Sequence, residues 1–177
     1  PPFSTVVRLC MGLADAFLQL HAQGLCYRDI SLGNVFFDPR TGDPLVCDND
    51  NVGVDGREPA RVLGTSRFMA PEVVRGEAQP STQTDLYSLS VLIFYLLMLH
   101  HPLQGRRELD IDCFDREAER RLFGLDPVFI FDPDDASNRP DSVVHGAVLT
   151  YWPLYPPFLR DDFVEAFTVG LAEPNRR

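Results

Sequence analysis

One short polar stretch of the sequence has residue types that could do chemistry. Residues 26–37 read CYRDISLGNVFF, in which Asp29 precedes Asn34 by five residues and an apolar triplet follows at once. A second apolar run, 45–47, ends at another acid, Asp48. If the two runs form short strands joined by a turn, Asn34 and Asp48 lie side by side. Carboxylate and amide oxygens are ligands that suit Mg²⁺, so the sequence predicts a magnesium pocket with Asp29 free beside it.

The composition indicates one globular domain. The 177 residues are 45% hydrophobic and 24% charged, which is ordinary for such a domain and allows a real core. The formal net charge of −10 argues against nucleic acid or an anionic membrane as the main partner of this segment. The most apolar run, 86–99, is shorter than the roughly 20 residues of a membrane span, so we expect a buried core helix there.

The cysteines favour a reducing, cytoplasmic compartment. No two of them form a CxxC pair, and most lie in apolar runs, so we expect buried free thiols rather than disulfides or zinc ligands. The four are Cys10, Cys26, Cys47 and Cys113. The acidic segment 131–141 has a loose similarity to a calcium loop, but the turn glycine is missing and we do not expect calcium there.

The elements that must hold the polar stretch are mostly helices. Apolar spacings of three and four predict a helix from Ser4 to Gly24, directly before the stretch. Residues 38–44 predict a turn between two short strands, and residues 49–64 predict an exposed loop. Further helices are expected to start near residue 71 and to cover residues 86–99, 110–122 and 159–171. The sequence thus predicts a mainly α fold with short β-hairpins.

Four motifs, in order, resemble eukaryotic-type (Hanks-type) protein kinases. Residues 27–34, YRDISLGN, resemble the HRDxxxxN catalytic loop, and residues 64–72, GTSRFMAPE, resemble the GT…APE segment. Asp85 and the apolar run after it resemble the start of the central helix of the C-terminal lobe (C-lobe). Glu173-Pro174 with Arg177 resembles the DPxxR motif that ends that lobe. The resemblance implies a mainly α kinase C-lobe whose short β-hairpins carry the catalytic loop and the metal-binding Asp.

The resemblance also implies a role for each candidate catalytic residue. Asp29 would accept or orient the substrate hydroxyl. Asn34 and Asp48 would hold Mg²⁺ against the phosphates of ATP. Thr65 would lie near Asp29 and the incoming substrate segment.

Four further residues have structural roles in this interpretation. Glu72 would pair with Arg177 in a buried bridge, and Asp85 would anchor the catalytic loop through backbone N–H groups. Arg28 would pair with a fixed acid, or, as the alternative, only cap nearby carbonyl groups. Since residues 49–64 contain no Ser, Thr or Tyr, that segment would need no phosphorylation there. The candidate acids for Arg28 are Asp50, Asp55 and Glu58.

Three positions depart from the family pattern. Tyr27 replaces the usual His, whose role is mainly structural, so Tyr can serve. Ser31 stands where serine/threonine kinases usually carry a Lys on the γ-phosphate, which removes a positive charge from the transition state. Arg67 is a candidate substitute for that charge. Residues 48–50, Asp-Asn-Asp, replace DFG, so the Phe and Gly that support the flip of this segment are missing.

The resemblance implies Mg-ATP-dependent phosphoryl transfer to Ser or Thr of proteins, with the GTxxxMAPE pattern favouring Ser/Thr over Tyr. A pseudokinase that acts as an interaction scaffold is the alternative, favoured by Ser31 and Asp-Asn-Asp. Retention of Asp29, Asn34 and Asp48 favours the enzyme. A small-molecule phosphotransferase with a kinase-like fold is a third reading, but those enzymes lack the MAPE segment.

Residues 1–177 are interpreted as a partial kinase domain. They contain no glycine-rich loop and no strand lysine to hold ATP, so we expect that the N-lobe is absent and the C-terminus truncated. The piece alone would then bind ATP weakly and would not turn over. The sequences of the motifs resemble those of bacterial kinases found beside PP2C-type phosphatases and von Willebrand-type proteins. Those two are candidate partners besides a protein substrate, and no nucleic acid or membrane contact is expected through this segment.

Overall fold

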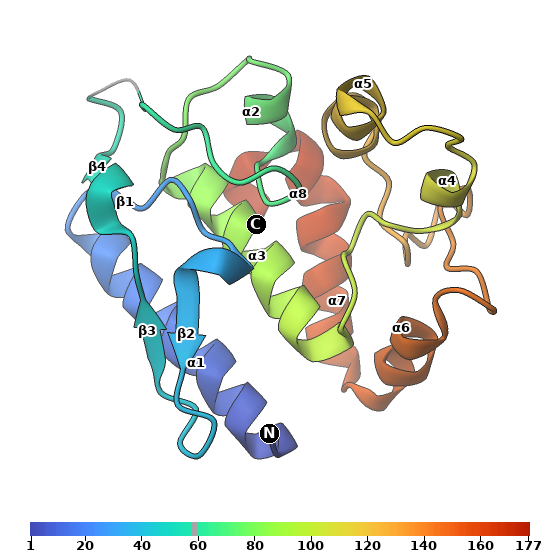
Figure 1. Ribbon diagram of the computed structural model, residues 1–177, viewed down its shortest axis with the longest axis horizontal. Coiled ribbons are helices and arrows are strands. Elements are labelled where there is room, and N and C mark those ends of the chain that lie inside the picture. Colours follow the sequence, from blue (N-terminus) through green and yellow to red (C-terminus); the bar gives the residue numbers. More distant parts are fainter. Residues whose placement is uncertain (58–59) are drawn as a thin grey trace.

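The computed structural model describes residues 1–57 and 60–177 and shows a helical body with two small strand pairs on one side (Figure 1). The mainly α fold with short β-hairpins is confirmed. The long helices are α1 (Phe3–Ala22), α3 (Thr82–Met98) and α7 (Pro157–Phe167). The short helices are α2 (Pro71–Val74), α4 (Arg106–Leu109), α5 (Arg116–Arg120), α6 (Gly146–Tyr151) and α8 (Val169–Ala172). The strands are β1 (Leu25–Cys26), β2 (Val35–Phe37), β3 (Pro44–Val46) and β4 (Gly53–Val54).

Helix α1 leads the chain into the polar stretch. It turns Leu9, Leu13 and Phe17 into the core, and it ends before Gly24, whose φ of +72° suits glycine. It begins at Phe3, one residue before the predicted start at Ser4, and no side chain caps it, so Ser4 is not the N-cap. Among the residues the structure describes, α1 is the one helix long and apolar enough to cross a membrane, with a mean hydropathy of 1.3. A core helix meets the same criterion, and α1 packs against α3.

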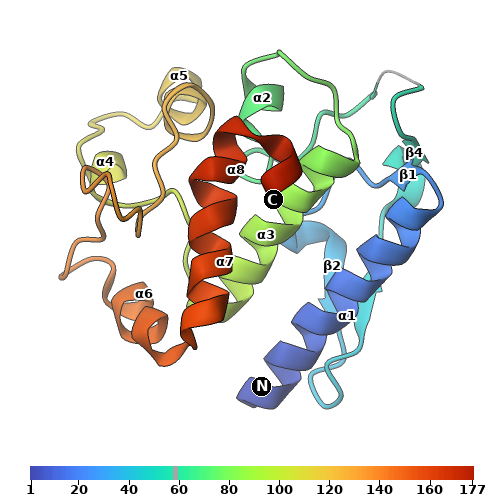
Figure 2. The ribbon, with the colours of Figure 1, turned by 180° about the vertical axis from the view of Figure 1, so that it is seen from behind.

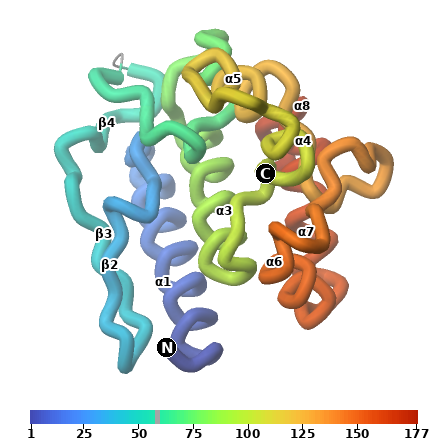
Figure 3. Tube along the Cα trace, turned by 45° about the vertical axis from the view of Figure 1, so that its right-hand side comes forward, coloured from blue at the N-terminus to red at the C-terminus, as the bar shows by residue number. Residues whose placement is uncertain are grey.

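Helix α3 lies between α1 and α7 from the front, from behind and from the side (Figures 1, 2 and 3). Its start is fixed by a capping box, in which Ser81 Oγ accepts from Thr84 N while Thr84 Oγ1 accepts from Ser81 N. It ends at Leu99, which has a left-handed φ of 53°. The apolar run expected to form a core helix does so, since Phe94 lies at the centre of an aromatic cluster. Its ring neighbours are Phe129, Trp152, Phe163 and Phe167.

The last predicted helix is divided in two. Helix α7 ends at Phe167 and α8 starts at Val169, because Thr168 leaves the helical conformation with φ −124° and ψ −82°. The residues that the two helices bury are Phe163, Ala166 and Phe167 of α7 and Gly170 of α8.

The helix predicted over 110–122 is wrong in extent. The chain instead forms α4 before this region and α5 within it, and a π-helical turn, Arg121–Leu125, follows. Asp115 starts α5 by accepting hydrogen bonds from the amides of Glu117 and Ala118. Gly124 is required in the turn, because a Cβ there would lie 2.5 Å from Val74 Cγ1 of α2.

The two strand pairs frame the polar stretch. Strands β2 and β3 pair antiparallel with Phe36 opposite Leu45, as the turn over 38–44 predicts. Strands β1 and β4 pair antiparallel with Leu25 opposite Val54, so part of the segment expected to be an exposed loop is tied to the polar stretch. The expected free thiols are present, with Cys10 and Cys26 buried and Cys113 exposed.

We predict that stability falls as the pH drops below about 6.5. His101 is 2% exposed, and burial lowers its pKa from 6.5 to about 3. Protonation between those two values therefore favours the unfolded chain, at about 1.4 kcal/mol per pH unit. Urea unfolding should show a free energy lower by about 2 kcal/mol at pH 5.0 than at pH 7.5.

The control for this prediction is His101→Gln, which cannot titrate in that range. Its unfolding free energy should change less between the two pH values than that of the natural chain. Equal pH dependence in both proteins would show that His101 is not the group responsible.

Candidate active site

The polar stretch is anchored by one buried carboxylate. Asp85, in the first turn of α3, is 1% exposed. It accepts hydrogen bonds from the backbone amides of Tyr27 at 2.6 Å and Arg28 at 2.8 Å. The ring nitrogen Nε2 of His21 lies 3.0 Å from the same carboxylate. This contact fixes Arg28, whose φ is +75°, and so aims the next residue, Asp29.

Three candidate catalytic residues meet at Asp29. The amide nitrogen Nδ2 of Asn34 donates to the Asp29 carbonyl at 2.9 Å and to carboxylate oxygen Oδ2 at 3.1 Å. The hydroxyl of Thr65 donates to the other oxygen, Oδ1, at 2.6 Å. Both carboxylate oxygens therefore have fixed directions, and one of them already accepts a hydroxyl hydrogen.

The hairpin places Asp48 beside Asn34. The amide of Cys47 donates to the Asn34 carbonyl at 2.9 Å, which extends the β2–β3 ladder by one residue pair. Asp48 follows in a left-handed conformation, φ 59° and ψ 60°, and is exposed. Because Asn34 uses its amide nitrogen on Asp29, its amide oxygen is left as a ligand.

The donor set of this hairpin fits Mg²⁺. In the part of the chain that the structure describes, no group of three or more His, Cys, Asp or Glu side chains is arranged to hold a metal. Mg²⁺ differs from zinc in this respect, because it usually takes one or two protein carboxylates and completes its shell with phosphate and water oxygens. The carboxylate of Asp48 and the amide oxygen of Asn34 match that pattern.

Tyr27 ties the polar stretch to the hairpin from the core side. It is 2% exposed, its ring packs edge-on against Phe17 at 5.6 Å, and its hydroxyl donates to the Cys47 carbonyl. Burial, and next the charge of Asp29, raises the pKa of Tyr27 to about 12. The hydroxyl therefore stays protonated and holds the residue that precedes Asp48, which is the structural role expected of a Tyr at this position.

The GT…APE segment lies against the polar stretch at Gly64. Its φ is +122°, and a Cβ there would lie 2.9 Å from Met69 Cγ and 3.3 Å from the Arg28 carbonyl. The hydroxyl of Ser88, from α3, donates to the Phe68 carbonyl at 2.7 Å. A side chain at position 64 would therefore push the segment, and Thr65 with it, away from Asp29.

Arg28 binds local acceptors. Its Nε donates to Cys26 Sγ at 3.3 Å and its Nη2 donates to the Val54 carbonyl at 3.4 Å. A Cβ at Gly53 would lie 2.5 Å from Nη2, so β4 covers the guanidinium closely.

Of the three acids predicted as partners of Arg28, the structure describes two. Within the described residues, neither Asp50 nor Asp55 forms an ion pair with it, and Asp55 accepts instead from the hydroxyl of Thr82 at 2.8 Å. The third candidate, Glu58, lies outside the described residues, so that pairing stays a prediction.

The charge missing at Ser31 is not replaced by Arg67. Ser31 is 3% exposed. The guanidinium carbon of Arg67 lies 5.1 Å from the ring centroid of Phe114, and its Nε lies 3.5 Å from Glu119 Oε1 in α5. The charge of Arg67 is thus committed to the α5 region.

The predicted contact between Glu72 and Arg177 is present. Arg177 binds both carboxylate oxygens of Glu72, at 2.6 and 2.9 Å, and donates to the Gly170 carbonyl at 2.7 Å. The side chain of Arg177 is 0% exposed and that of Glu72 is 12% exposed. The guanidinium carbon of Arg177 lies 5.3 Å from the ring centroid of Tyr87. This bidentate pair joins α2 to the C-terminal end of the chain.

The sequence interpretation missed an apolar pair on the outer face of the hairpin. Phe36 and Leu45 lie directly opposite each other and are 59% and 61% exposed. Strict alternation of side chains along a strand could have found them, because Val35 and Phe37 point to the core.

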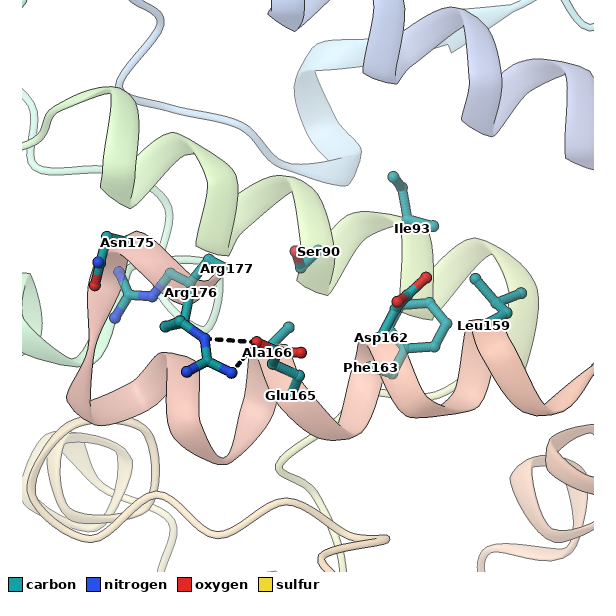
Figure 4. Close-up of a pocket in the computed structure, with 10 residues that line it drawn as sticks. All are labelled: Ser90, Ile93, Leu159, Asp162, Phe163, Glu165, Ala166, Asn175, Arg176 and Arg177. Carbon is teal, nitrogen blue, oxygen red and sulfur yellow. Dashed lines mark hydrogen bonds and ion pairs between the residues drawn. The ribbon is translucent and has the colours of Figure 1, made fainter.

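A cavity of about 510 Å³ lies between α3, α7 and the C-terminal residues (Figure 4). Its polar lining includes the ion pair between Arg176 and Glu165 at 2.6 Å. Asp29, Asn34, Asp48 and Thr65 do not line it, so this cavity is not part of the candidate site.

Comparison with known proteins places this geometry among kinases. The model of the protein kinase domain matches residues 4–143. The chain is 33% identical over 130 residues to protein kinase MCK1 of Saccharomyces cerevisiae, covering 72% of this chain and 34% of that protein. It is 34% identical over 130 residues to CBL-interacting protein kinase 4 of Oryza sativa subsp. japonica, covering 70% and 28%. It is 30% identical over 105 residues to probable serine/threonine-protein kinase SCO3848 of Streptomyces coelicolor, covering 56% and 15%. The matches thus span about a third or less of these relatives.

Removing the Glu72 carboxylate should strongly destabilise the chain. Glu72→Gln leaves the buried guanidinium of Arg177 without its counter-charge, which typically costs about 3 kcal/mol or more. We expect that loss in urea unfolding, and we expect the double variant Glu72→Gln/Arg177→Met to recover part of it, since the uncompensated charge is gone.

The matched control is Glu77→Gln. Glu77 also pairs with an arginine, Arg75, but the side chains of that pair are more exposed, at 59% for Glu77 and 25% for Arg75. An exposed pair contributes about 0–1 kcal/mol. Equal losses in the two single variants would contradict a special role for the buried pair.

Proposed function

We propose a phosphoryl-transfer function for this chain on the premise that it belongs to the protein kinase family, which its match over residues 4–143 establishes. The reaction we propose is transfer of the γ-phosphoryl group of Mg-ATP to Ser or Thr hydroxyls of protein substrates. The similarity to a probable serine/threonine-protein kinase of Streptomyces coelicolor supports the Ser/Thr assignment. The 177 residues would form the C-lobe, and an N-terminal lobe would complete the enzyme.

The observation that carries this proposal is the hydrogen bond from Thr65 Oγ1 to Asp29 Oδ1 at 2.6 Å. It shows a carboxylate placed to accept a hydroxyl hydrogen, which is what a substrate Ser or Thr presents. Asp29 would orient that hydroxyl and take its proton as the oxygen attacks the γ-phosphorus. Asn34 holds the second carboxylate oxygen, so only one direction of approach is favoured.

The metal would be held at the hairpin. Asp48 supplies a carboxylate and Asn34 an amide oxygen, on adjacent ends of β2 and β3. When bound, Mg²⁺ neutralises charge on the phosphate oxygens. The backbone bond from Cys47 to Asn34 and the hydroxyl of Tyr27 on Cys47 would keep the two ligands in register.

The chain supplies only part of a nucleotide site. All 16 basic residues are arginine, so no lysine in these residues can reach a phosphate. The exposed apolar pair, Phe36 and Leu45, lies on the same hairpin as the proposed metal ligands and offers an apolar surface on which a base could lie. The kinases that the chain matches are about three or more times longer than the matched region. Their length supports a second lobe as the source of the remaining contacts with the nucleotide.

A pseudokinase scaffold is the second candidate function. The observation that favours it is Ser31, buried at 3% exposure, with no lysine in the sequence to replace the charge it lacks. Against it stands the convergence of Asp29, Asn34 and Thr65, which a scaffold does not require. We also propose a PP2C-type phosphatase and a von Willebrand-type protein as partners, in a bacterial signalling context. The similarity of the motifs to those of bacterial kinases supports this. The proposed location is cytoplasmic, which the unpaired cysteines favour.

Autophosphorylation and substrate labelling test the assigned roles. In the natural polypeptide that carries these residues, Asp29→Asn should lower kcat by about 10²–10⁴-fold, because the positioned base is lost. Asp48→Ala should strongly reduce labelling and raise the Mg²⁺ concentration that the remaining labelling needs. The control is Asp43→Asn, an exposed acid in the turn of the same hairpin, which should leave labelling intact.

Two outcomes would overturn these roles. Label transfer that survives both substitutions would exclude Asp29 and Asp48 as the acting groups. No transfer to any protein by the natural sequence would favour the scaffold instead.

The isolated 177 residues should bind Mg-ATP weakly and should not turn it over. They contain the metal ligands and Asp29 but neither a glycine-rich loop nor a lysine. Calorimetric titration should detect weak binding that Asp48→Ala removes, and joining an N-terminal kinase lobe should strengthen it. Turnover by the isolated chain would contradict the proposed division of labour.

A further inference from the structure

A buried imidazole holds the backbone of the GT…APE segment. His101 follows the end of α3 and is 2% exposed. Its Nε2 lies 2.8 Å from the Arg67 carbonyl, and its Nδ1 accepts from the Leu103 amide at 3.1 Å. Because Nδ1 is an acceptor, the neutral ring carries its proton on Nε2, which donates to Arg67. Both ring nitrogens are therefore used, and the tautomer is set by the two bonds.

The carbonyl that His101 holds belongs to a residue in a costly conformation. Arg67 has φ +71°, which lies in the left-handed region that non-glycine residues rarely adopt. Such a conformation persists only where its surroundings fix it. The side chain of Arg67 is held as well, between the rings of Phe114 and Phe123 and beside Glu119.

Phe123 connects the two halves of this arrangement. Its ring centroid lies 4.9 Å from that of His101, edge-on, and 5.9 Å from the guanidinium carbon of Arg67. Phe123, in the turn after α5, thus contacts both the ring that holds the Arg67 carbonyl and the side chain of Arg67. The loop cannot relax at Arg67 without disturbing both contacts.

The fixed turn lies directly beside the candidate catalytic carboxylate. Arg67 is two residues after Thr65, whose hydroxyl donates to Asp29, and the Phe68 amide closes the turn by donating to the Thr65 carbonyl at 3.0 Å. The next carbonyl along, that of Phe68, accepts from Ser88 of α3. Two successive carbonyls of the segment, those of Arg67 and Phe68, are therefore held by His101 and by Ser88 of α3.

We propose that His101 is a positioning residue for the substrate-facing segment 64–68: by holding Arg67 in its left-handed conformation it sets Thr65 against Asp29. His101 touches neither substrate nor the reacting atoms. Its effect on phosphoryl transfer rests on the proposed function, whereas its effect on the segment does not.

The clamp works without a change of charge. The charged and titratable groups that face His101 are Arg67 and His100, and burial lowers the pKa of His101 to about 3. The ring therefore stays neutral, with the same donor, throughout the range from pH 5 to pH 8.

Three variants separate the hydrogen bond from simple packing. His101→Phe keeps a ring against Phe123 but removes the donor. His101→Gln keeps an N–H donor at a similar reach. Arg67→Gly adopts a positive φ without strain, so it reduces the need for the clamp.

Amide hydrogen exchange of the 177-residue chain measures the segment directly. His101→Phe should speed exchange of the Phe68 amide at least tenfold while amides in the middle of α3 keep their rates. His101→Gln should restore much of the protection. The effect of His101→Phe should be smaller when Arg67→Gly is also present. Unchanged exchange at Phe68 in His101→Phe, or loss of protection in His101→Gln equal to that in His101→Phe, would overturn the proposal.

Kinetics of the natural polypeptide give the second reading. His101→Phe should raise KM for the protein substrate about tenfold and leave KM for ATP unchanged, with His101→Gln closer to the natural enzyme. A change in KM for ATP alone would overturn the assignment to the substrate-facing segment. If the natural polypeptide transfers no phosphate at all, the proposed function fails by itself, and the exchange rates still decide whether His101 sets the segment.

Discussion

The carboxylate of Asp85 is the contact on which the rest of the structure depends. A fully buried charge is tolerated only where hydrogen bonds compensate it, and here the compensation comes from the amides of Tyr27 and Arg28 and from the ring of His21. Those groups belong to the end of α1 and to the polar stretch, so α3, α1 and the polar stretch assemble together. The left-handed turn at Arg28 is held by the same contact, and it directs Asp29 out of the core toward its partners.

Helix α3 organises the site along its whole length. Asp85 in its first turn holds the polar stretch, and Ser88 one turn later holds the Phe68 carbonyl. His101, just past its end, holds the Arg67 carbonyl. Helix α3 thus brings Asp29 and Thr65 together. The helix is itself held at the centre of the fold, because moving it would disturb the aromatic cluster around Phe94.

The chain is better equipped to position groups than to supply positive charge. Asp29, Asn34 and Thr65 have fixed directions, but the arginines nearest the site are committed elsewhere: Arg28 to Cys26 and Val54, and Arg67 to the α5 region. Phosphoryl transfer needs both positioning and charge neutralisation. The proposed division between two lobes would explain this imbalance, with the proposed metal ligands on this chain and further phosphate contacts on a second lobe.

The sequence by itself determined the features that depend on neighbouring residues. The periodicity of α1 and α3, the hairpin that brings Asn34 to Asp48, and the motifs around Asp29 and Thr65 follow from short-range patterns and turn residues. The tertiary structure alone decided the pairing of β1 with β4, the division of the 110–122 region at Asp115, and the contact of His101 with Arg67 across 34 residues. Such contacts leave no periodic signal, because they arise only when distant segments pack on α3, and the hydrogen-bond partner of a buried group is chosen by whichever backbone atom that packing brings within reach.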